Sequence, residues 1–164
     1  SYLSLVEQLK ERSVTRTYLA MVVGAPVINK TINEPIGRHP KIRTKQAVNQ
    51  NGKEAITRFS IFENLDGYSL LKVNLETGRT HQIRVHLSHI GYPIIGDPLY
   101  GSRNKFSRGS SEELKKIISN FKRQALHAEE LQLNHPSSGE LLSFKASMPS
   151  DMQTLLNQIK VNGS

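Results

Sequence analysis

The densest run of polar side chains in the chain is Glu-Thr-Gly-Arg-Thr-His-Gln-Ile-Arg-Val-His, residues 76–86. It lies where a predicted strand is followed by a predicted helix, so backbone N–H groups and the guanidinium groups of Arg79 and Arg84 converge there. Free N–H groups at the start of a helix and planar guanidinium groups both bind anions. The run therefore predicts an anion-binding junction.

The helix expected from about Thr80 to Ile90 has two different faces. His81, Arg84 and Ser88 are spaced i, i+3 and i+7 and share one face. The opposite face carries an apolar stripe of Ile83, Leu87 and Ile90. We expect the apolar face to anchor the helix and the polar face to remain free to act. The alternative is an ordinary solvated polar face without a role in chemistry.

Three histidines of this region raise the question of a zinc site. His86 and His89 are i, i+3 neighbours and could share a metal ion. His81 and His86, however, are separated by about 500° of helix rotation, and no Cys or nearby Glu completes a recognisable ligand set. We therefore expect ordinary hydrogen-bonded histidines and no metal.

Basic residues are clustered in three parts of the chain. The first cluster contains no acidic residue and consists of Arg38, Lys41, Arg43 and Lys45. The other two are formed by Arg103, Lys105 and Arg108, and by Lys115, Lys116, Lys122 and Arg123. Together with a net charge of +8, these clusters predict binding to nucleic acid through its phosphates. With five Tyr, five Phe and no Trp, a broad base-stacking platform is not supported, whereas a pocket for one base is compatible with the sequence.

Tyr18 is the one phenol within an otherwise apolar predicted strand, Thr17–Val23. Its ordinary interpretation is a tyrosine at the rim of the core with its hydroxyl group hydrogen-bonded. The acids Asp66, Asp97 and Asp151 occupy a turn, a loop and a helix start, which are common structural positions for aspartate. None of the three has the setting of a nucleophile.

Helices and strands alternate irregularly along the chain. Besides the helix at 80–90, helices are predicted over Tyr2–Arg12, after an N-cap at Ser110 or Ser111, and after Ser150. Strands are predicted over Thr17–Val23, within Ile32–Phe62, and over Tyr68–Leu75, Leu126–Leu133 and Leu141–Ala146. A hairpin loop is predicted at Asn51-Gly52, a second turn at Asp66-Gly67, and a helix C-terminus at Gly91. The pattern predicts an α+β fold with a mixed, mostly antiparallel sheet and flanking helices. The first helix should pack its Leu3, Val6 and Leu9 stripe on that sheet.

The composition limits the classes of protein that this chain can belong to. Its 164 residues suit one domain, and 22 Lys+Arg against 14 Asp+Glu favour an acidic partner. The chain has no Cys, which excludes disulfides, thiolate metal sites and cysteine nucleophiles and is compatible with the reducing cytoplasm. No apolar stretch approaches the length of a membrane span. We expect a cytoplasmic protein that does not bind membranes.

Two long motifs resemble those of a known family. The segment Leu-Glu-Thr-Gly-Arg-Thr-His-Gln-Ile-Arg-Val-His, residues 75–86, is followed by Gly-Tyr-Pro-Ile-Ile-Gly-Asp-Pro-Leu-Tyr-Gly, residues 91–101. Both resemble the signature of the RluA-type pseudouridine synthases, most closely the RluD-like branch that modifies large-subunit ribosomal RNA. Further agreement is found at residues 15–18, 35–40, 52–57 and 123–128. The resemblance implies the pseudouridine synthase catalytic fold and isomerisation of uridine to pseudouridine in RNA.

The resemblance also assigns roles to individual residues. It implies that Tyr18 stacks on the target uracil and takes part in proton removal from C5, and that Arg84 pairs with the catalytic aspartate. It further implies that the reaction uses no cofactor and that the partner is RNA, with large-subunit ribosomal RNA as the expected substrate. From charge and position, the residues expected to bind RNA are Arg38, Lys41, Arg43, Lys45, Arg79 and His81.

The chain departs from the family in one respect. The catalytic aspartate of the family belongs to a His-Arg-Leu-Asp motif upstream of the tyrosine, and these 164 residues contain no such motif. We therefore expect residues 1–164 to be the C-terminal part of a catalytic domain, monomeric and inactive alone. The first alternative is a basic RNA-binding module without chemistry. The second is a metal hydrolase that uses the histidines.

Overall fold

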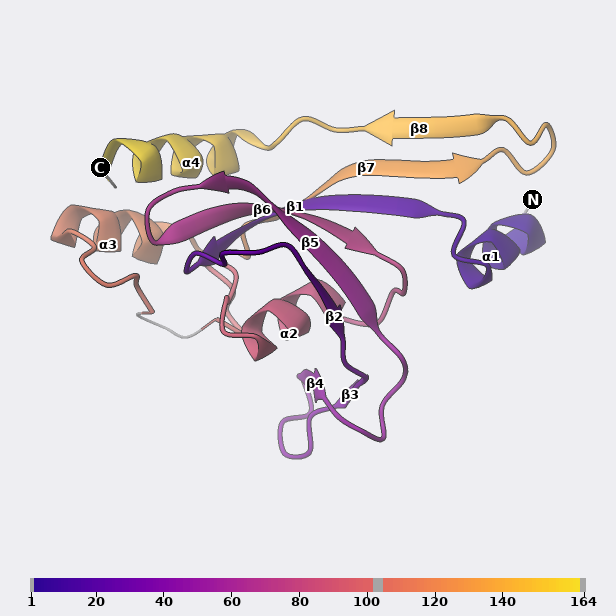
Figure 1. Cartoon of the computed structure of the whole chain (residues 1–164), viewed down its shortest axis with the longest axis horizontal. Coiled ribbons are helices and arrows are strands. Elements are labelled where there is room, and N and C mark those ends of the chain that lie inside the picture. Colours follow the sequence, from indigo (N-terminus) through magenta and orange to yellow (C-terminus); the bar gives the residue numbers. More distant parts are fainter. Residues whose placement is uncertain (1, 102–104, 163–164) are drawn as a thin grey trace.

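The computed structural model describes residues 2–101 and 105–162 as a layered α+β structure (Figure 1). The helices are α1 (Tyr2–Lys10), α2 (Gln82–His89), α3 (Glu112–Asn120) and α4 (Ser150–Asn162). The strands are β1 (Thr15–Val23), β2 (Lys30–Asn33), β3 (Ile36–Arg38), β4 (Gln46–Val48), β5 (Ile56–Asn64), β6 (Tyr68–Leu75), β7 (Leu126–Asn134) and β8 (Leu141–Lys145). Within the described ranges, no helix has the length and apolar character needed to cross a bilayer. Arg103, from the second basic cluster, lies outside these ranges.

Six strands form one sheet in the order β2-β5-β6-β1-β7-β8, and every neighbouring pair is antiparallel. This arrangement confirms the predicted α+β class with a mostly antiparallel sheet. The central strand β1 has consecutive buried residues from Leu19 to Val23, because both of its faces are covered over this half. The hairpin of β3 and β4 forms a separate two-stranded sheet.

Helices cover the two faces of the sheet unequally. In Figure 1, α2 lies below the sheet, whereas α4 lies above its left-hand end, where it packs with α3. Apolar residues of β1, β5 and β6 form one core with Ile83 and Leu87 of α2 and with Met152 and Ile159 of α4. The right-hand ends of β1, β7 and β8 extend beyond both helical layers.

The local signals are confirmed at Asp66-Gly67, Gly91 and Ser111, whereas the hairpin loop predicted at Asn51-Gly52 is wrong: these residues follow β4, which does not pair with the next strand, and residues 39–45 form the loop of the hairpin. Asp66 and Gly67 both have positive φ, 56° and 90°, as a tight turn between antiparallel strands requires. Gly91 has φ 90° and ends α2, with its N–H donating to Ser88 O and that of Tyr92 donating to Leu87 O. The Ser111 side chain caps α3 by accepting a hydrogen bond from Leu114 N.

The predicted packing of the first helix is wrong. Leu3 and Leu9 of α1 are 79% and 48% exposed, so they do not join the core. The buried residue of α1 is Gln8, whose side chain donates to Asn134 O and accepts from Asn134 N at the end of β7. In Figure 1 the helix lies beyond the end of the sheet. It is therefore attached by amide hydrogen bonds to a strand end, because no sheet face lies opposite its apolar stripe.

Candidate active site and nucleic-acid surface

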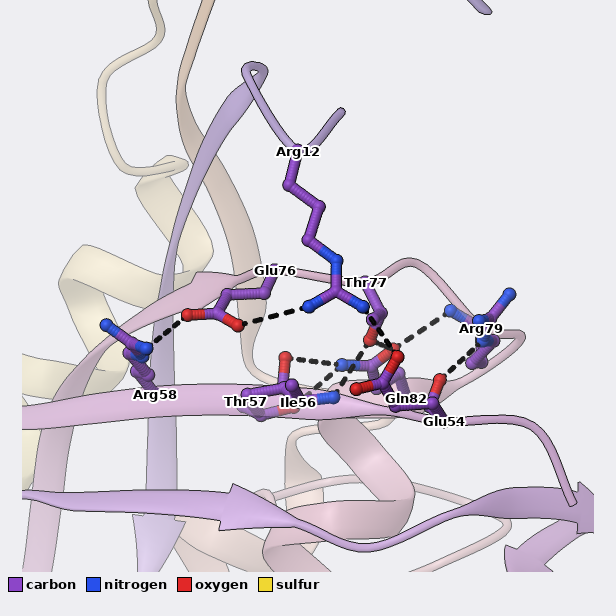
Figure 2. Close-up of polar contacts among 9 residues, drawn as sticks. All are labelled: Arg12, Glu54, Ile56, Thr57, Arg58, Glu76, Thr77, Arg79 and Gln82. Atoms are coloured by element: carbon purple, nitrogen blue, oxygen red, sulfur yellow. Dashed lines mark hydrogen bonds and ion pairs between the residues drawn. The ribbon is translucent and has the colours of Figure 1, made fainter. Parts of the chain in front are cut away.

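A buried hydrogen-bond network joins the end of β6 and the start of α2 to β5 (Figure 2). The Thr77 hydroxyl accepts from Ile56 N at 2.9 Å and donates to Gln82 Oε1 at 2.8 Å. Gln82 Nε2 in turn donates to Ile56 O and Thr57 Oγ1, and Gln82 Oε1 also accepts from Arg79 N. The polar run of the sequence is therefore partly structural, because Thr77 and Gln82 hold the start of α2 in place.

His86 continues this network into the core. Its Nδ1 lies 2.7 Å from Thr57 Oγ1, and its Nε2 lies 2.8 Å from the carbonyl oxygen of Glu34. The carbonyl can only accept, so Nε2 carries the proton and Nδ1 accepts from the Thr57 hydroxyl. Burial lowers the pKa of His86 below its ordinary value, and the hydrogen bond to Glu34 offsets this only in part. The prediction of an ordinary hydrogen-bonded histidine is confirmed here, since both ring nitrogens are engaged.

Arg84 forms a buried, bidentate ion pair with Asp97. Its Nε and Nη2 donate to Asp97 Oδ2 and Oδ1 at 2.9 and 2.8 Å, and the two side chains are 10% and 1% exposed. Asp97 Oδ1 also accepts from the backbone N–H groups of Leu99 and Tyr100. Burial opposes ionisation of Asp97, but the hydrogen bonds from Arg84, Leu99 and Tyr100 outweigh it and lower the pKa of Asp97. The same pair raises the pKa of Arg84.

The prediction that the His81, Arg84 and Ser88 face of the helix stays free is therefore wrong for Arg84. The loop that contains Asp97 and Tyr100 covers this face: Ser88 Oγ donates to Tyr100 O at 3.0 Å. His81 is half-buried, with its Nδ1 2.7 Å from the Tyr100 hydroxyl. Burial and the charge of Arg84 lower the pKa of His81. Periodicity within one helix could not reveal this second layer, because the covering loop lies later in the chain.

Tyr100 connects Arg84 to the basic hairpin. Its hydroxyl accepts from Gln46 N at 2.9 Å, and its ring centre lies 5.0 Å from Arg84 Cζ and 5.9 Å from Lys45 Nζ. Both cations lie within the range of cation–π attraction. The sequence reasoning gave Tyr100 no role and treated Asp97 as an ordinary loop acid. In the sequence, the one indication of a role for Asp97 and Tyr100 was their position in the second motif, residues 91–101.

The first basic cluster lies on the β3–β4 hairpin and its loop, which project from the bottom of the molecule in Figure 1. Arg38, Lys41 and Arg43 are exposed, whereas Lys45 is half-buried beside Tyr100. The loop is shaped by His39, whose Nδ1 accepts from the N–H groups of residues 41 and 42. The hairpin thus presents three cations to solvent on an ordered support.

Tyr18 lies in the first half of β1, where it is half-buried and packs against the main core. It lines a cavity of about 320 Å³ together with Arg16, Leu131 and Phe144. The expectation that its hydroxyl is tied down is not met by any hydrogen bond within the described part of the chain. Arg84 does not line this cavity. The structure therefore brings His81, Arg84 and Lys45 together around Tyr100, but leaves Tyr18 in a separate opening.

Arg79, the remaining predicted RNA-binding residue, follows the glycine of the first motif. Its Nε donates to the carbonyl oxygen of Glu54 at 2.8 Å, and the side chain is half-buried. It lines a second cavity, of about 420 Å³, with residues of α1 and β1. Arg79 thus lies at neither the hairpin nor the Tyr18 cavity.

Comparison with known proteins identifies the family. A sequence profile described as RNA pseudouridylate synthase matches residues 2–89, more than half of the chain and including Tyr18 and Arg84. The chain belongs to this synthase family. Asp97 and Tyr100 lie beyond the matched residues, in the second motif.

The similarity to individual synthases extends over nearly the whole chain. The "Ribosomal large subunit pseudouridine synthase D" of Xanthomonas campestris is 48% identical over 157 residues, which is 96% of this chain and 47% of that protein. The synthase of the same name from Escherichia coli K12 is 44% identical over 158 residues, covering 96% of this chain and 48% of its own length. The chain therefore spans about half the length of these relatives.

Solved structures of other synthases share the fold. "Human RNA Pseudouridylate Synthase Domain Containing 1" superimposes with a TM-score of 0.69 at 29% identity, over 88% of this chain and 58% of that one. "Human RNA Pseudouridylate Synthase Domain Containing 4" gives a TM-score of 0.75 at 23% identity, over 96% and 67% of the two chains. The second likeness concerns the fold alone.

Proposed function

We propose that this chain is part of an enzyme that isomerises uridine to pseudouridine in large-subunit ribosomal RNA in the cytoplasm. The observation that carries the proposal is the family match across residues 2–89, which contains the polar run at 76–86. The choice of ribosomal RNA is supported by relatives named for the ribosomal large subunit that are 44–48% identical to this chain. In the reaction the bond between ribose C1′ and uracil N1 breaks, the base rotates, C1′ bonds to C5, the C5 proton is released, and N1 takes up a proton.

We assign Tyr18 to the target base. Apolar side chains, Leu131 and Phe144, line the cavity together with the phenol ring, so it offers surfaces against which a planar base can stack. A base reaches such a cavity only after leaving its own stack, which costs a few kcal/mol and least in RNA loops. This cost favours structured RNA loops as substrates over regular duplex.

We assign Arg84 to the nucleophilic carboxylate. Asp97 accepts from Nε and Nη2 of Arg84, which holds one edge of the guanidinium group in place. The group has five N–H donors, so Nη1 remains for a second carboxylate. No His-Arg-Leu-Asp motif occurs in the 164 residues, and the relatives are about twice as long, so we propose that this carboxylate comes from another part of the enzyme.

Tritium release from ribosomal RNA carrying uridine labelled at C5 tests the proposed reaction. The chain is compared with a form extended at its N-terminus through the segment that carries the His-Arg-Leu-Asp motif. We expect release by the extended form only. Release by the chain alone would contradict the assignment of the nucleophile, and RNA binding without release by either form would identify a binding module.

Arg84→Lys in the extended form tests the assigned role. Lysine keeps the charge beside Asp97 but cannot form the bidentate pair that fixes the guanidinium group. We expect turnover to fall about 10²-fold, since a small misplacement at a reacting centre has that effect. The dissociation constant for RNA should change far less, and an equal loss in both would contradict the role. A circular dichroism spectrum identical to the wild type serves as the control for folding.

A further inference from the structure

A basic cavity of about 420 Å³ lies between α1, the start of β1 and the turn after β6. None of the roles assigned above uses it. Its lining side chains include four cations, Lys10, Arg12, Arg16 and Arg79, and one acid, Glu76. Val6 and Leu9 of α1 form its apolar wall.

The one acid in the cavity is already paired. Figure 2 shows the Glu76 carboxylate between the guanidinium groups of Arg58 and Arg12. Arg12 also contacts Glu54 at 2.6 Å. Lys10 and Arg16, by contrast, form no ion pair within residues 2–101 and 105–162. The cavity therefore retains an excess of positive charge.

Arg16 carries an unsatisfied donor. Its Nε is buried and has no hydrogen-bond partner in the described part of the chain. An unpaired buried donor on a charged group is costly, and such groups are rare in folded proteins. The position also depends on Gly78, because a Cβ at residue 78 would lie 2.5 Å from Arg16 Nη1. Glycine in the first motif thus leaves room for the guanidinium group of Arg16.

Arg16 also borders the cavity of Tyr18. The two residues are two apart on β1, so their side chains project from the same face of the strand, about 6.7 Å apart along it. The same guanidinium group therefore lines both the basic cavity and the opening assigned to the target base.

We propose that Arg16 binds a backbone phosphate of the RNA, next to the nucleotide whose base enters the Tyr18 cavity. Lys10 and Arg79 add positive charge at the edge of the same site. A guanidinium group keeps its positive charge and has paired N–H donors whose planar geometry fits phosphate oxygens. The identity of the anion as RNA phosphate rests on the proposed function.

The salt dependence of RNA binding tests this site. The probe is a fluorescent single-stranded RNA of random sequence, titrated with the chain between low and moderate salt. For Arg16→Gln we expect the slope of log affinity against log salt to become shallower by about 0.7, the value for one phosphate contact on a single strand. At low salt the affinity should fall roughly tenfold, as for a lost charged hydrogen bond. Lys160→Gln on α4 removes the same charge elsewhere and should leave the slope unchanged.

Gly78→Ala provides a second variant with the net charge unchanged. The added Cβ displaces the Arg16 guanidinium, so the slope should again become shallower although no charge is lost. Thermal melts of all three variants show whether each is folded. If Arg16→Gln is unfolded, the salt slope measured for Gly78→Ala decides the test. A slope equal to that of the wild type in the folded variants would overturn the site. Tritium release by the extended form is measured separately, so failure of the enzyme assignment and failure of this site remain distinguishable.

Discussion

Burial lowers the pKa of His86, and both of its ring nitrogens are engaged in hydrogen bonds. Gln82 donates to Thr57 Oγ1, the Thr57 hydroxyl donates to His86 Nδ1, and His86 Nε2 donates to Glu34 O. Each hydrogen donated along this series of hydrogen bonds has one acceptor. Protonation of His86 Nδ1 would place two hydrogens between this nitrogen and the Thr57 hydroxyl oxygen. The protonated form of His86 therefore destabilises the folded protein.

We predict that the free energy of unfolding decreases as the pH falls below about 6.5, the ordinary pKa of histidine. The pKa of His86 is lower in the folded state, so the unfolded state binds more protons between the two values. The stabilisation is fully present above the unfolded pKa and is lost as the pH falls towards the folded one. His81 contributes in the same direction, since its pKa is also lowered.

Urea unfolding at a series of pH values from 8 to 5 checks this prediction, with His86→Gln as the comparison. The variant should show a smaller decrease over this range, because only His81 and other groups then titrate. Equal decreases in the two proteins would show that His86 does not carry the effect.

At the scale of elements, the start of α2 depends on side chains rather than on a helix cap. His81, at the N-cap position, has φ 57° and makes no capping hydrogen bond with its side chain. The hydroxyl of Thr77 and the amide of Gln82 instead connect the helix to the backbone of Ile56 on β5. Because α2 carries Arg84, this junction also sets the position of the guanidinium group.

Thr77→Val tests the junction with a residue of the same shape. The change leaves the buried N–H of Ile56 without an acceptor, so we expect a loss of about 1–3 kcal/mol in the free energy of unfolding. Thr80→Val, at an exposed position three residues later, should stay within about 0.5 kcal/mol of the wild type. Urea denaturation midpoints measure both. Similar losses in the two variants would mean that the Thr77 hydroxyl has no special part in stability.

At the scale of the molecule, one group of exposed cations lies on the projecting β3–β4 hairpin. Arg38, Lys41 and Arg43 are exposed there, and Tyr100 joins the hairpin to the Arg84 pair. The hairpin proposed to contact RNA and the guanidinium group of Arg84 are therefore connected through Tyr100. The Tyr18 cavity and the basic cavity are both lined by Arg16 of β1, and the basic cavity is also lined by residues of α1.

We predict that the triple variant Arg38→Gln, Lys41→Gln, Arg43→Gln has a salt slope shallower by about 2, at about 0.7 per phosphate contact on single-stranded RNA. A control variant, Lys30→Gln with Lys160→Gln, removes two exposed charges on β2 and α4, so the change in slope is compared per charge removed. Its slope should change less per charge. Equal changes per charge would indicate that RNA responds to net charge and not to the hairpin.

The features that the sequence predicted correctly are those decided by neighbours in the chain. The turn at Asp66-Gly67, the end of α2 at Gly91 and the Ser111 cap depend on backbone dihedral angles and hydrogen bonds within a few residues. The strand at Tyr68–Leu75 was predicted with its observed bounds, since the turn at Asp66-Gly67 precedes it and the polar run at 76–86 follows it. The family, too, was recognisable from the two motifs.

The sequence by itself thus determined the elements, the fold class and the family, whereas the tertiary structure decided how the polar residues are used. Arg84 pairs with Asp97 across 13 residues, His86 contacts Glu34 across 52, and Tyr100 contacts Gln46 across 54. Periodicity assigns a residue to a face of its own helix, but the loop that covers that face arrives from elsewhere in the chain. The exposed stripe of α1 and the burial of Arg84 have the same physical reason: burial depends on what lies opposite, which only the folded chain brings into place.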